Sequence, residues 1–323
     1  MVLKFKKLGV IFDPLKYSKS PNWMQEFAQA PNAIEIDGII RVYFCTRGQP
    51  DANKMYISRL AYVDLDPSNL AVVGISKEPC LSLGNLGEFD EFGTYPVSVL
   101  NRNGSIHAAY GGWTRCESVP FNISMGMSES NNGGKSFVKF GAGPVLSPFL
   151  DEPYIITSPK LRFFGDRYVM TYTAGHKWIE DDNGKPEIIY KLRLAFSENL
   201  KDWVRLGKDI IPDKLGVDEA QACGDIFFKN DKYHMFFCYR QALDFRNNPS
   251  NTYRIGYASS SNLIDWTRDD TVTEDLQPSE TGWDSEMVAY PNVLELDSRL
   301  LMFYGGNGNG KTGFGAVEIE GFT

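Results

Sequence analysis

The sequence of 323 residues has little of what several common kinds of site require. It contains only three histidines, widely spaced, and an odd number of cysteines, five. Scattered histidines argue against a zinc site, which needs several ligands close together. Cys45, Cys223 and Cys238 stand in apolar strand patterns, which is typical of buried free thiols in a reducing compartment. We therefore expect no metal and no other cofactor.

Long hydrophobic runs and an excess of basic residues are also missing. No apolar stretch is long enough to span a bilayer, and residues 1–7 do not resemble the start of a signal peptide. The formal net charge is -8, which disfavours nucleic acid and anionic membranes as partners. We therefore expect a cytoplasmic protein with neither kind of partner. Nothing in the sequence indicates the oligomeric state.

What the chain does have is an internal repeat. A Pro or Gly flanked by small or aromatic residues precedes an apolar strand five times, at intervals of about 65 residues. The five markers are Ala30-Pro31, Tyr95-Pro96, Ser158-Pro159, Cys223-Gly224 and Tyr290-Pro291. A fixed period of this length indicates a repeat architecture, so it decides the fold before any single motif does.

Each repeat contains the signals of four strands. The first strand is followed by a short turn, such as Asp37-Gly38, Asn103-Gly104 or Asp297-Ser298, and by a second strand rich in aromatic residues. Such turns between β-rich runs predict hairpins. A third strand is clearest where residues 192–203 match residues 255–266, and a fourth begins at Trp203 and Trp266. Four antiparallel strands per repeat are typical of a propeller blade.

The N-terminal segment supplies the strand that the last repeat lacks. Residues 5–14 follow the pattern of the fourth strands in repeats two and three, whereas repeat five ends after its third strand. Closing the ring in this way removes an open sheet edge. The sequence thus predicts an all-β fold, a single five-bladed β-propeller over residues 1–323. The blades span about 27–84, 85–148, 149–212, 213–278 and 279–320, and residues 3–14 complete the last one.

In a propeller, the residues before each first strand and after each second strand converge at one end of the ring. Acids stand five positions before four of the five markers, with Tyr154 in the remaining repeat: Glu26, Glu91, Glu219 and Glu286, flanked by Asp90, Glu152, Asp218 and Asp284. The second strands end at Arg47, Trp113, Arg115, His176, Lys177, Arg240 and Asn307. Carboxylates and arginines bind hydroxyl groups and aromatic rings cover sugar faces, so this set predicts a carbohydrate site. The alternative is a structural role that the equivalent acids share.

On these features the chain resembles the five-bladed propeller glycoside hydrolases of the arabinanase, β-xylosidase and invertase type, families 43 and 32. The most specific local pieces are the Ser-x-Asn-Leu-x-x-Trp motifs at Ser197–Trp203 and Ser260–Trp266, and the Pro-containing strand starts. The resemblance implies action on a glycosidic bond of an oligo- or polysaccharide. Those families place an Asp before the first Pro, an Asp in blade two and a Glu in blade three. Here the matching positions hold Ala30, Tyr95 and Thr157 or Ser158, so the usual triad is not matched.

Glycoside hydrolysis requires one protonated and one ionised carboxyl group. We expect this pair to come from Glu286, Glu219 and Glu91. The expected substrate-binding residues are Asp90, Asp218, Asp284, Arg47, Trp113, His176, Arg240 and Asn307. Two alternatives remain open: a propeller that binds carbohydrate without cleaving it, and a glycoside phosphorylase that holds phosphate with Arg47, Arg240 and His176.

One further segment, Gly305–Thr312, matches the spacing of a phosphate-binding loop. That loop functions only between a parallel strand and a helix, whereas an alternating, strand-like run follows here. We therefore interpret the segment as a hairpin at the funnel rim, where Asn307 or Asn309 can reach a ligand.

Overall fold

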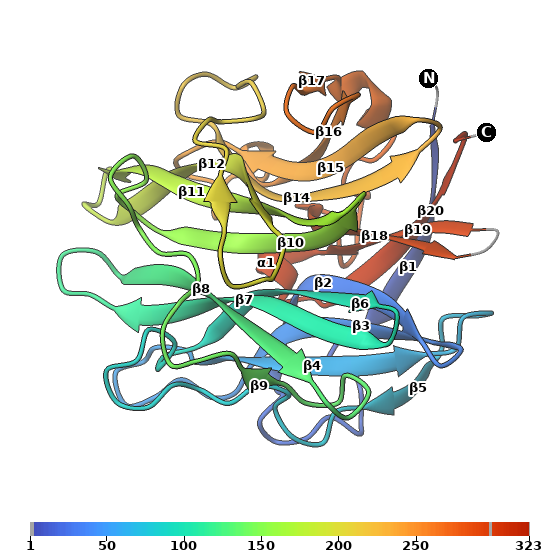
Figure 1. The fold of residues 1–323 in the computed structure, drawn as a ribbon, viewed down its shortest axis with the longest axis horizontal. Coiled ribbons are helices and arrows are strands. Elements are labelled where there is room, and N and C mark those ends of the chain that lie inside the picture. The colour runs from blue at the N-terminus through green and yellow to red at the C-terminus, as the bar shows by residue number, and fades with distance from the viewer. Residues whose placement is uncertain (1–2, 297–298, 323) are drawn as a thin grey trace.

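Five four-stranded antiparallel sheets form the computed structural model, which describes residues 3–296 and 299–322 (Figure 1). The first blade contains β2 (Glu26–Ile36), β3 (Ile39–Arg47), β4 (Ser58–Leu65) and β5 (Val72–Ile75). The second contains β6 (Thr94–Arg102), β7 (Ser105–Arg115), β8 (Phe121–Ser130) and β9 (Val138–Lys139). The third contains β10 (Ile156–Phe164), β11 (Arg167–Glu180), β12 (Pro186–Ser197) and β13 (Val204–Arg205). The fourth contains β14 (Ala220–Lys229), β15 (Lys232–Arg240), β16 (Arg254–Ser260) and β17 (Thr267–Arg268).

The fifth blade joins the two ends of the chain. It contains β18 (Ala289–Leu296), β19 (Arg299–Gly305), β20 (Phe314–Glu320) and, as its outermost strand, β1 (Lys4–Phe12). β1 pairs antiparallel with β20, so the blue N-terminal strand lies beside the red C-terminal one in Figure 1. The predicted all-β five-bladed propeller and its closure by the N-terminal strand are both confirmed. The predicted turn Asp297-Ser298 lies outside the described residues.

Polar side chains of the innermost strands connect neighbouring blades. Each accepts a hydrogen bond from a backbone N–H of the next blade, which would otherwise be a costly unpaired donor. The bonds join Ala33 N to Asn292 Oδ1 (2.7 Å), Val99 N to Asn32 Oδ1 (2.6 Å), Leu161 N to Ser98 Oγ (2.9 Å) and Val293 N to Asp225 Oδ2 (2.6 Å). The residue after the marker of blade three, Lys160, is equally buried. These bonds fix the positions of the innermost strands relative to one another. They therefore also fix which side chains of these strands line the centre of the ring.

The repeat marker itself is a β-bulge. The pairing register shifts at the marker in each of the five innermost strands. Ala30, Ser158, Cys223 and Tyr290 have φ between 49° and 59°, and the Tyr95-Pro96 peptide bond is cis. A left-handed backbone at non-glycine residues costs of order 1–3 kcal/mol each and is concentrated at functional sites. The five bulges therefore indicate a functional site at the end of the ring where they lie.

The two Ser-x-Asn-Leu-x-x-Trp motifs form the same turn. Leu200 and Leu263 both have a left-handed backbone, and their carbonyl oxygens accept the indole N–H of Trp203 (3.0 Å) and Trp266 (2.9 Å). Both indoles also pack against the hydrophobic clusters between blades. These tryptophans therefore hold blade corners and do not belong to a site.

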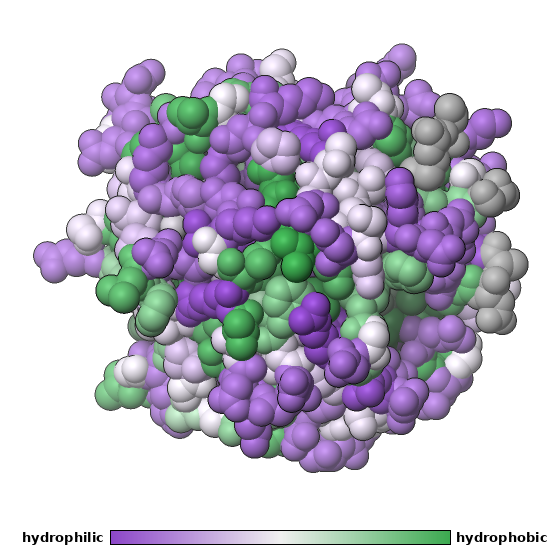
Figure 2. Space-filling view, turned by 45° about the horizontal axis from the view of Figure 1, so that its top comes forward, coloured by the Kyte–Doolittle hydropathy of each residue, from purple (hydrophilic) through white to green (hydrophobic). Residues whose placement is uncertain are grey.

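The remaining surface and the cysteines are simple to describe. On the face shown in Figure 2, hydrophilic residues surround hydrophobic ones that gather near the centre. Cys45, Cys80, Cys223 and Cys238 are buried free thiols, and Cys116 is an exposed one. Within the described part of the chain, no helix has the length and apolar character needed to cross a membrane.

Candidate functional site

A cavity of about 310 Å³ lies where the five blades converge. This volume is at the lower end of the range of about 300–1,000 Å³ that is usual for ligand pockets. Its wall includes Gln29 and Arg47 from blade one, Tyr95, Trp113 and Phe121 from blade two, Ser158, Trp178, Glu187 and Tyr190 from blade three, Ala222, Arg240, Phe245 and Tyr253 from blade four, and Tyr290 and Asn309 from blade five. The residues come from the bulges of first strands, the ends of second strands and the starts of third strands.

One side of the cavity is an aromatic wall formed by Trp113, Phe121 and Trp178. The ring centroids of Trp113 and Phe121 are 4.4 Å apart, and those of Phe121 and Trp178 are 5.5 Å apart. The Trp113 indole donates a hydrogen bond of 2.7 Å to the Tyr95 carbonyl oxygen, which fixes its ring against the bulge of β6. All three rings are only partly buried, so they offer an apolar surface on which the ring of a ligand can lie.

A cluster of phenols forms another part of the wall and adjoins the aromatic wall where the Tyr95 and Trp113 ring centroids are 5.9 Å apart. The hydroxyl groups of Tyr190 and Tyr253 are hydrogen-bonded to each other, and the Tyr290 hydroxyl donates to Asn309 Oδ1 at 3.2 Å. Burial raises the pKa of Tyr95, Tyr253 and Tyr290 well above the ordinary value. These phenols therefore stay protonated at neutral pH, and a ligand oxygen accepts one of their O–H groups where it takes the place of a present acceptor, such as Asn309 Oδ1 for Tyr290.

Arg240 also lines the cavity, next to the rings of Tyr190 and Tyr253, and is buried, with 2% of its surface exposed. Its Nη1 donates to the carbonyl oxygens of Gln241 (2.8 Å) and Ala242 (3.0 Å), and its Nη2 to the Tyr190 hydroxyl (3.2 Å). Its Nε has no hydrogen-bond partner among the described residues. Burial by itself lowers the pKa of Arg240, but the Tyr190 and Tyr253 phenols raise it above its ordinary value. Arg240 is therefore a buried cation whose partners are all uncharged.

The other charged residues of the wall are Arg47, Lys185, Glu187 and Arg246. The Arg47 guanidinium lies over the rings of Phe27 (4.5 Å) and Tyr56 (5.3 Å), and its Nε is 3.3 Å from Ser58 Oγ. Glu187, with 7% of its surface exposed, forms ion pairs with Arg246 and with Lys185 (3.0 Å). It is the only carboxylate in the wall as the described residues define it.

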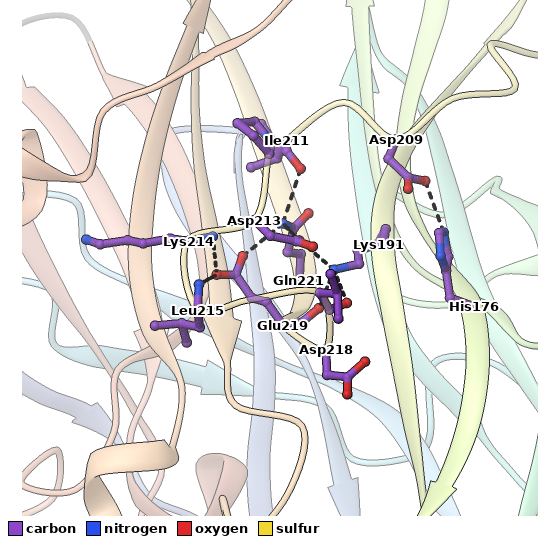
Figure 3. A network of polar contacts seen from close by, with 12 residues as sticks. His176, Lys191, Asp209, Ile211, Asp213, Lys214, Leu215, Asp218, Glu219 and Gln221 are labelled. Atoms are coloured by element: carbon purple, nitrogen blue, oxygen red, sulfur yellow. Dashed lines mark hydrogen bonds and ion pairs between the residues drawn. The ribbon is translucent and has the colours of Figure 1, made fainter.

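The structure places the three expected catalytic carboxylates away from this wall. Glu219 is fully buried, where its Oε1 accepts from Arg268 (2.6 Å) and Gln221 (2.9 Å) and its Oε2 from the backbone N–H groups of Lys214 and Leu215 (Figure 3). The Glu91 carboxylate accepts from Gly87 N within its own loop (2.9 Å). Glu286 is exposed. The expected acid-rich funnel therefore differs from the observed cavity, and a catalytic role for these three residues stays a prediction.

A shared structural role accounts for the repeated acids. In blades two to five, a buried acid just before the first strand forms an ion pair with a cation on the outermost strand of the same blade. The pairs are Asp90–Lys139 (2.6 Å), Glu152–Arg205, Glu219–Arg268 (2.6 Å) and Asp284–Lys7 (2.8 Å). These acids lie five to seven positions before the markers, so only Glu219 coincides with the five-residue spacing seen in the sequence. Acids do recur before the first strands, but those that are buried form clamps within blades two to five.

The expected substrate-binding residues divide into two groups. Arg47, Trp113 and Arg240 lie in the cavity wall, and their contact with a ligand stays a prediction. Asp90 and Asp284 belong to the clamps. His176 Nε2 is 3.1 Å from Asp209 Oδ1, and Asp218 forms an ion pair with Lys177 (2.8 Å), so both lie in the polar network of Figure 3. Asn307 Oδ1 accepts from the backbone N–H groups of Glu286 (2.8 Å) and Met287 (3.3 Å) and so shapes its own loop.

The glycine-rich segment at residues 305–312 is a turn between antiparallel strands. β19 ends at Gly305, β20 begins at Phe314, and the single turn of α1 (Asn307–Gly310) has left-handed residues at Gly308 and Asn309. This arrangement differs from a phosphate-binding loop, which follows a parallel strand. Asn309 reaches the cavity, as the interpretation of a hairpin at the rim allowed.

Sequence reasoning missed the contribution of the third strands. Phe121 begins β8, Tyr190 lies early in β12, and Tyr253 directly precedes β16, and all three line the cavity. A signal for them existed, because each is an aromatic residue near the start of a third strand. Their common place beside the cavity was not visible without the strand pairing, since the loops before these strands differ in length.

Comparison with known proteins places the chain among relatives. No family model matches it. It is 30% identical over 320 residues to "Uncharacterized protein Rv1502" of Mycobacterium tuberculosis strain H37Rv and to "Uncharacterized protein MT1551" of strain CDC 1551, which covers 98% of this chain and 100% of each relative. The chain belongs to the same family as these two proteins.

Solved structures show where this family stands by fold. A GH130 structure, from work on glycoside hydrolases that target β-1,2 mannosidic linkages in Candida mannan, matches with a TM-score of 0.72 at 15% identity and covers 98% of this chain and 94% of that one. β-1,2-Mannobiose phosphorylase from Listeria innocua matches at 0.68 and 12%, with 99% and 96% covered. A thermostable family-43 glycoside hydrolase matches at 0.60 and 15%, with 91% and 88% covered. The resemblance to five-bladed propeller glycoside hydrolases is thus confirmed for the fold.

Proposed function

We propose that this protein is a glycoside hydrolase-like protein that binds an oligo- or polysaccharide in its central cavity. One observation carries the proposal: the aromatic wall of Trp113, Phe121 and Trp178 and the polar groups of Arg47, Arg240 and the phenol cluster line one cavity. An apolar surface combined with polar groups suits a sugar, which has an apolar ring face and hydroxyl groups at its edge. The fold supports the proposal, because its solved neighbours include glycoside hydrolases and phosphorylases.

The geometry favours binding over hydrolysis by a carboxylate pair. A hydrolase needs two carboxyl groups about 5–9.5 Å apart across the scissile bond. The described cavity wall offers one, Glu187, and both cations beside it already neutralise it. The positions at which the resemblance to glycoside hydrolases leads us to expect acids hold Ala30, Tyr95 and Thr157 or Ser158. Cleavage of a glycosidic bond remains a second candidate because Glu187 does lie in the wall.

The binding proposal is tested by a variant that removes part of the aromatic wall. The full-length protein is screened on an oligosaccharide array, and calorimetry then measures the affinity for each saccharide that binds. Trp178→Ala should weaken binding about tenfold or more, because aromatic anchors carry much of the energy at such sites. Phe228→Ala, at an exposed aromatic residue of β14 outside the wall, is the matched control and should leave affinity unchanged. Equal affinities of the two variants would contradict the proposal.

An activity assay decides between the candidates. The protein is incubated with a panel of aryl glycosides and oligosaccharides, with and without inorganic phosphate. Turnover that Glu187→Gln abolishes would support cleavage through the cavity carboxylate, whereas loss in Glu286→Gln would support the acid pair expected from the sequence. Turnover that depends on phosphate would identify a phosphorylase. Saccharide binding without turnover on the panel supports a binding protein.

We also propose a cytoplasmic location. Four cysteines are buried free thiols and a fifth is exposed, which suits a compartment where thiols stay reduced. Fractionation of the native cells with an antibody against the protein tests this location directly.

A further inference from the structure

The charge of the cavity is opposite to that of the protein. The whole chain has a formal net charge of -8. The cavity wall carries the cations Arg47, Lys185, Arg240 and Arg246 against the single carboxylate Glu187, a formal charge of +3. A concave site with one sign of charge concentrates ligands of the other sign. The composition of the chain does not explain a positively charged cavity in a negatively charged protein. The cavity therefore has its own preference for negatively charged ligands.

Two of these cations, Arg240 and Arg47, form no ion pair with an acid among the described residues. The partners of the Arg240 guanidinium are carbonyl oxygens, a phenol and aromatic rings, and its Nε is unpaired among the described residues. Arg47 contacts Ser58 Oγ and two aromatic rings. A buried charge is costly unless an opposite charge or strong hydrogen bonds compensate it. The other two buried arginines of the described residues are paired with acids, Arg41 with Asp64 and Arg193 with Glu152, which sets Arg240 apart from them.

Neutral donors reinforce these cations. The buried phenols of Tyr95, Tyr253 and Tyr290 belong to the same wall, and Thr157 Oγ1, also in the wall, has no hydrogen-bond partner among the described residues. Guanidinium and hydroxyl donors together are what a carboxylate or phosphate group requires, because each of its oxygens accepts several hydrogen bonds. An uncharged sugar would leave both arginines without a counter-charge.

We propose that the saccharide carries an oxyanion, a carboxylate or a phosphate ester, and that Arg240 and Arg47 bind this group. The inference rests on the proposed function and narrows its ligand class to acidic or phosphorylated sugars. The anion belongs to the saccharide, because the arginines share one cavity with the aromatic wall. A free phosphate ion would use the cations but leave the rings of Trp113, Phe121 and Trp178 uncovered.

The experiment compares matched ligands on the full-length protein. Calorimetry measures binding of a panel of uronic acid glycosides and sugar phosphates, each with its neutral counterpart, and of inorganic phosphate alone. The acidic member of at least one pair should bind tenfold or more tightly than its neutral counterpart, because hydrogen bonds to ionised groups are the strong ones. The preference should weaken as salt is added.

Variants then locate the effect in the cavity. Arg47→Met should weaken binding of the acidic ligand much more than binding of its neutral counterpart and so remove most of the preference, and Arg47→Lys should restore part of it. Arg47 is chosen because it is only half-buried, so its loss endangers folding less than loss of Arg240. Arg167→Met, at an exposed arginine that lies over the Phe196 ring outside the cavity, is the control and should change neither affinity.

The outcomes separate the inference from the function on which it rests. Neutral saccharides that bind as tightly as acidic ones would overturn the inference and leave the proposed function standing. Inorganic phosphate that binds as tightly as the sugar-borne anion would also overturn it and indicate a free phosphate site. If the oligosaccharide array and the matched panel both give no binding, the proposed function and the inference both fail.

Discussion

The ion pair between Glu219 and Arg268 allows the most direct test of whether the repeated acids have a structural role, as clamps within blades, rather than a catalytic one. The Glu219 side chain has no exposed surface and that of Arg268 has 6% exposed, and the two charges are 2.6 Å apart. Glu219→Gln removes the negative charge and keeps the shape. Removing one partner of a buried ion pair costs about 3–5 kcal/mol, because the other charge is left uncompensated.

The expected magnitude is near the lower end of that range. Arg268 keeps a second carboxylate, Asp270, at 2.9 Å. A glutamine at position 219 also still offers a carbonyl oxygen to the backbone N–H groups of Lys214 and Leu215, which now donate to Oε2. We therefore expect Glu219→Gln to lower the free energy of unfolding by about 3 kcal/mol. The double variant Glu219→Gln with Arg268→Met should recover part of this loss, since the uncompensated guanidinium is removed and Asp270 keeps Lys214 as a partner at 3.2 Å.

Chemical denaturation followed by tryptophan fluorescence measures the effect, with Glu286→Gln as the control. Glu286 is exposed, so its substitution should change the free energy of unfolding by less than about 0.5 kcal/mol. If Glu219→Gln proves as stable as the natural protein and instead loses activity on a glycoside, the clamp interpretation is refuted and the catalytic assignment from the sequence gains support.

Three further predictions concern the closure, the channel and the pH dependence. Phe12→Ala in the closing strand should lower the free energy of unfolding by about 3–5 kcal/mol, because Phe12 is 2% exposed and packs between blades one and five. Val10→Ala, at a 42% exposed position of the same strand, should have little effect. Equal losses of stability in the two variants, measured by denaturant unfolding, would contradict the closure. Lys160→Met should raise the thermal midpoint by about 2 °C, because the Lys160 ammonium is buried without a hydrogen-bond partner among the described residues and burial lowers its pKa; a fall in the midpoint would show that the amine stabilises the channel. Burial alone raises the pKa of Asp209, but His176 and Arg193 lower it below its ordinary value. The contribution of Asp209 to stability is therefore present above its unfolded pKa of about 3.9, and it is lost as the pH falls through its lower folded pKa. Asp209→Asn should flatten that acid branch of the thermal midpoint against pH, and an unchanged branch would exclude this role.

The fold could be predicted because short local sequence signals specify its strands and turns, and these signals recur from repeat to repeat. The markers, the hairpin turns and the Trp-containing corner at residues 197–203 and 260–266 each report on neighbouring residues in the chain. The N-terminal closure was predictable for the same reason, since residues 5–14 carry the fourth-strand pattern that blade five lacks. A repeat multiplies weak local evidence, so five moderate signals specify one ring.

The site was harder to predict because it depends on orientation. The sequence correctly indicated that first-strand starts and second-strand ends meet, and it brought Arg47, Trp113 and Arg240 to the cavity wall. It did not reveal that the acids before each first strand turn towards the outermost strand of their own blade. A shift of one or two residues decides this: Asp90 and Asp284 are buried in clamps, whereas Glu286 is exposed. Side-chain direction in loops is set by tertiary contacts, which spacing along the chain does not encode.

The bulges belong both to the fold, because they lie at the repeat markers, and to the site, because several of them line the cavity. They therefore bear on the question of catalysis. Ala30, Ser158, Cys223 and Tyr290 retain a costly left-handed backbone at equivalent positions although none of them is an acid. The rest of the blade holds this backbone in place, because the polar residue after the bulge, such as Asn32, Asp225 or Asn292, is bonded to the next blade. The propeller therefore presents a ring of side chains to the cavity whatever their chemistry. In this chain the bulge residues that line the cavity, Tyr95, Ser158 and Tyr290, present phenols and a hydroxyl group beside arginines, which suits capture of an anionic saccharide better than hydrolysis by paired carboxylates.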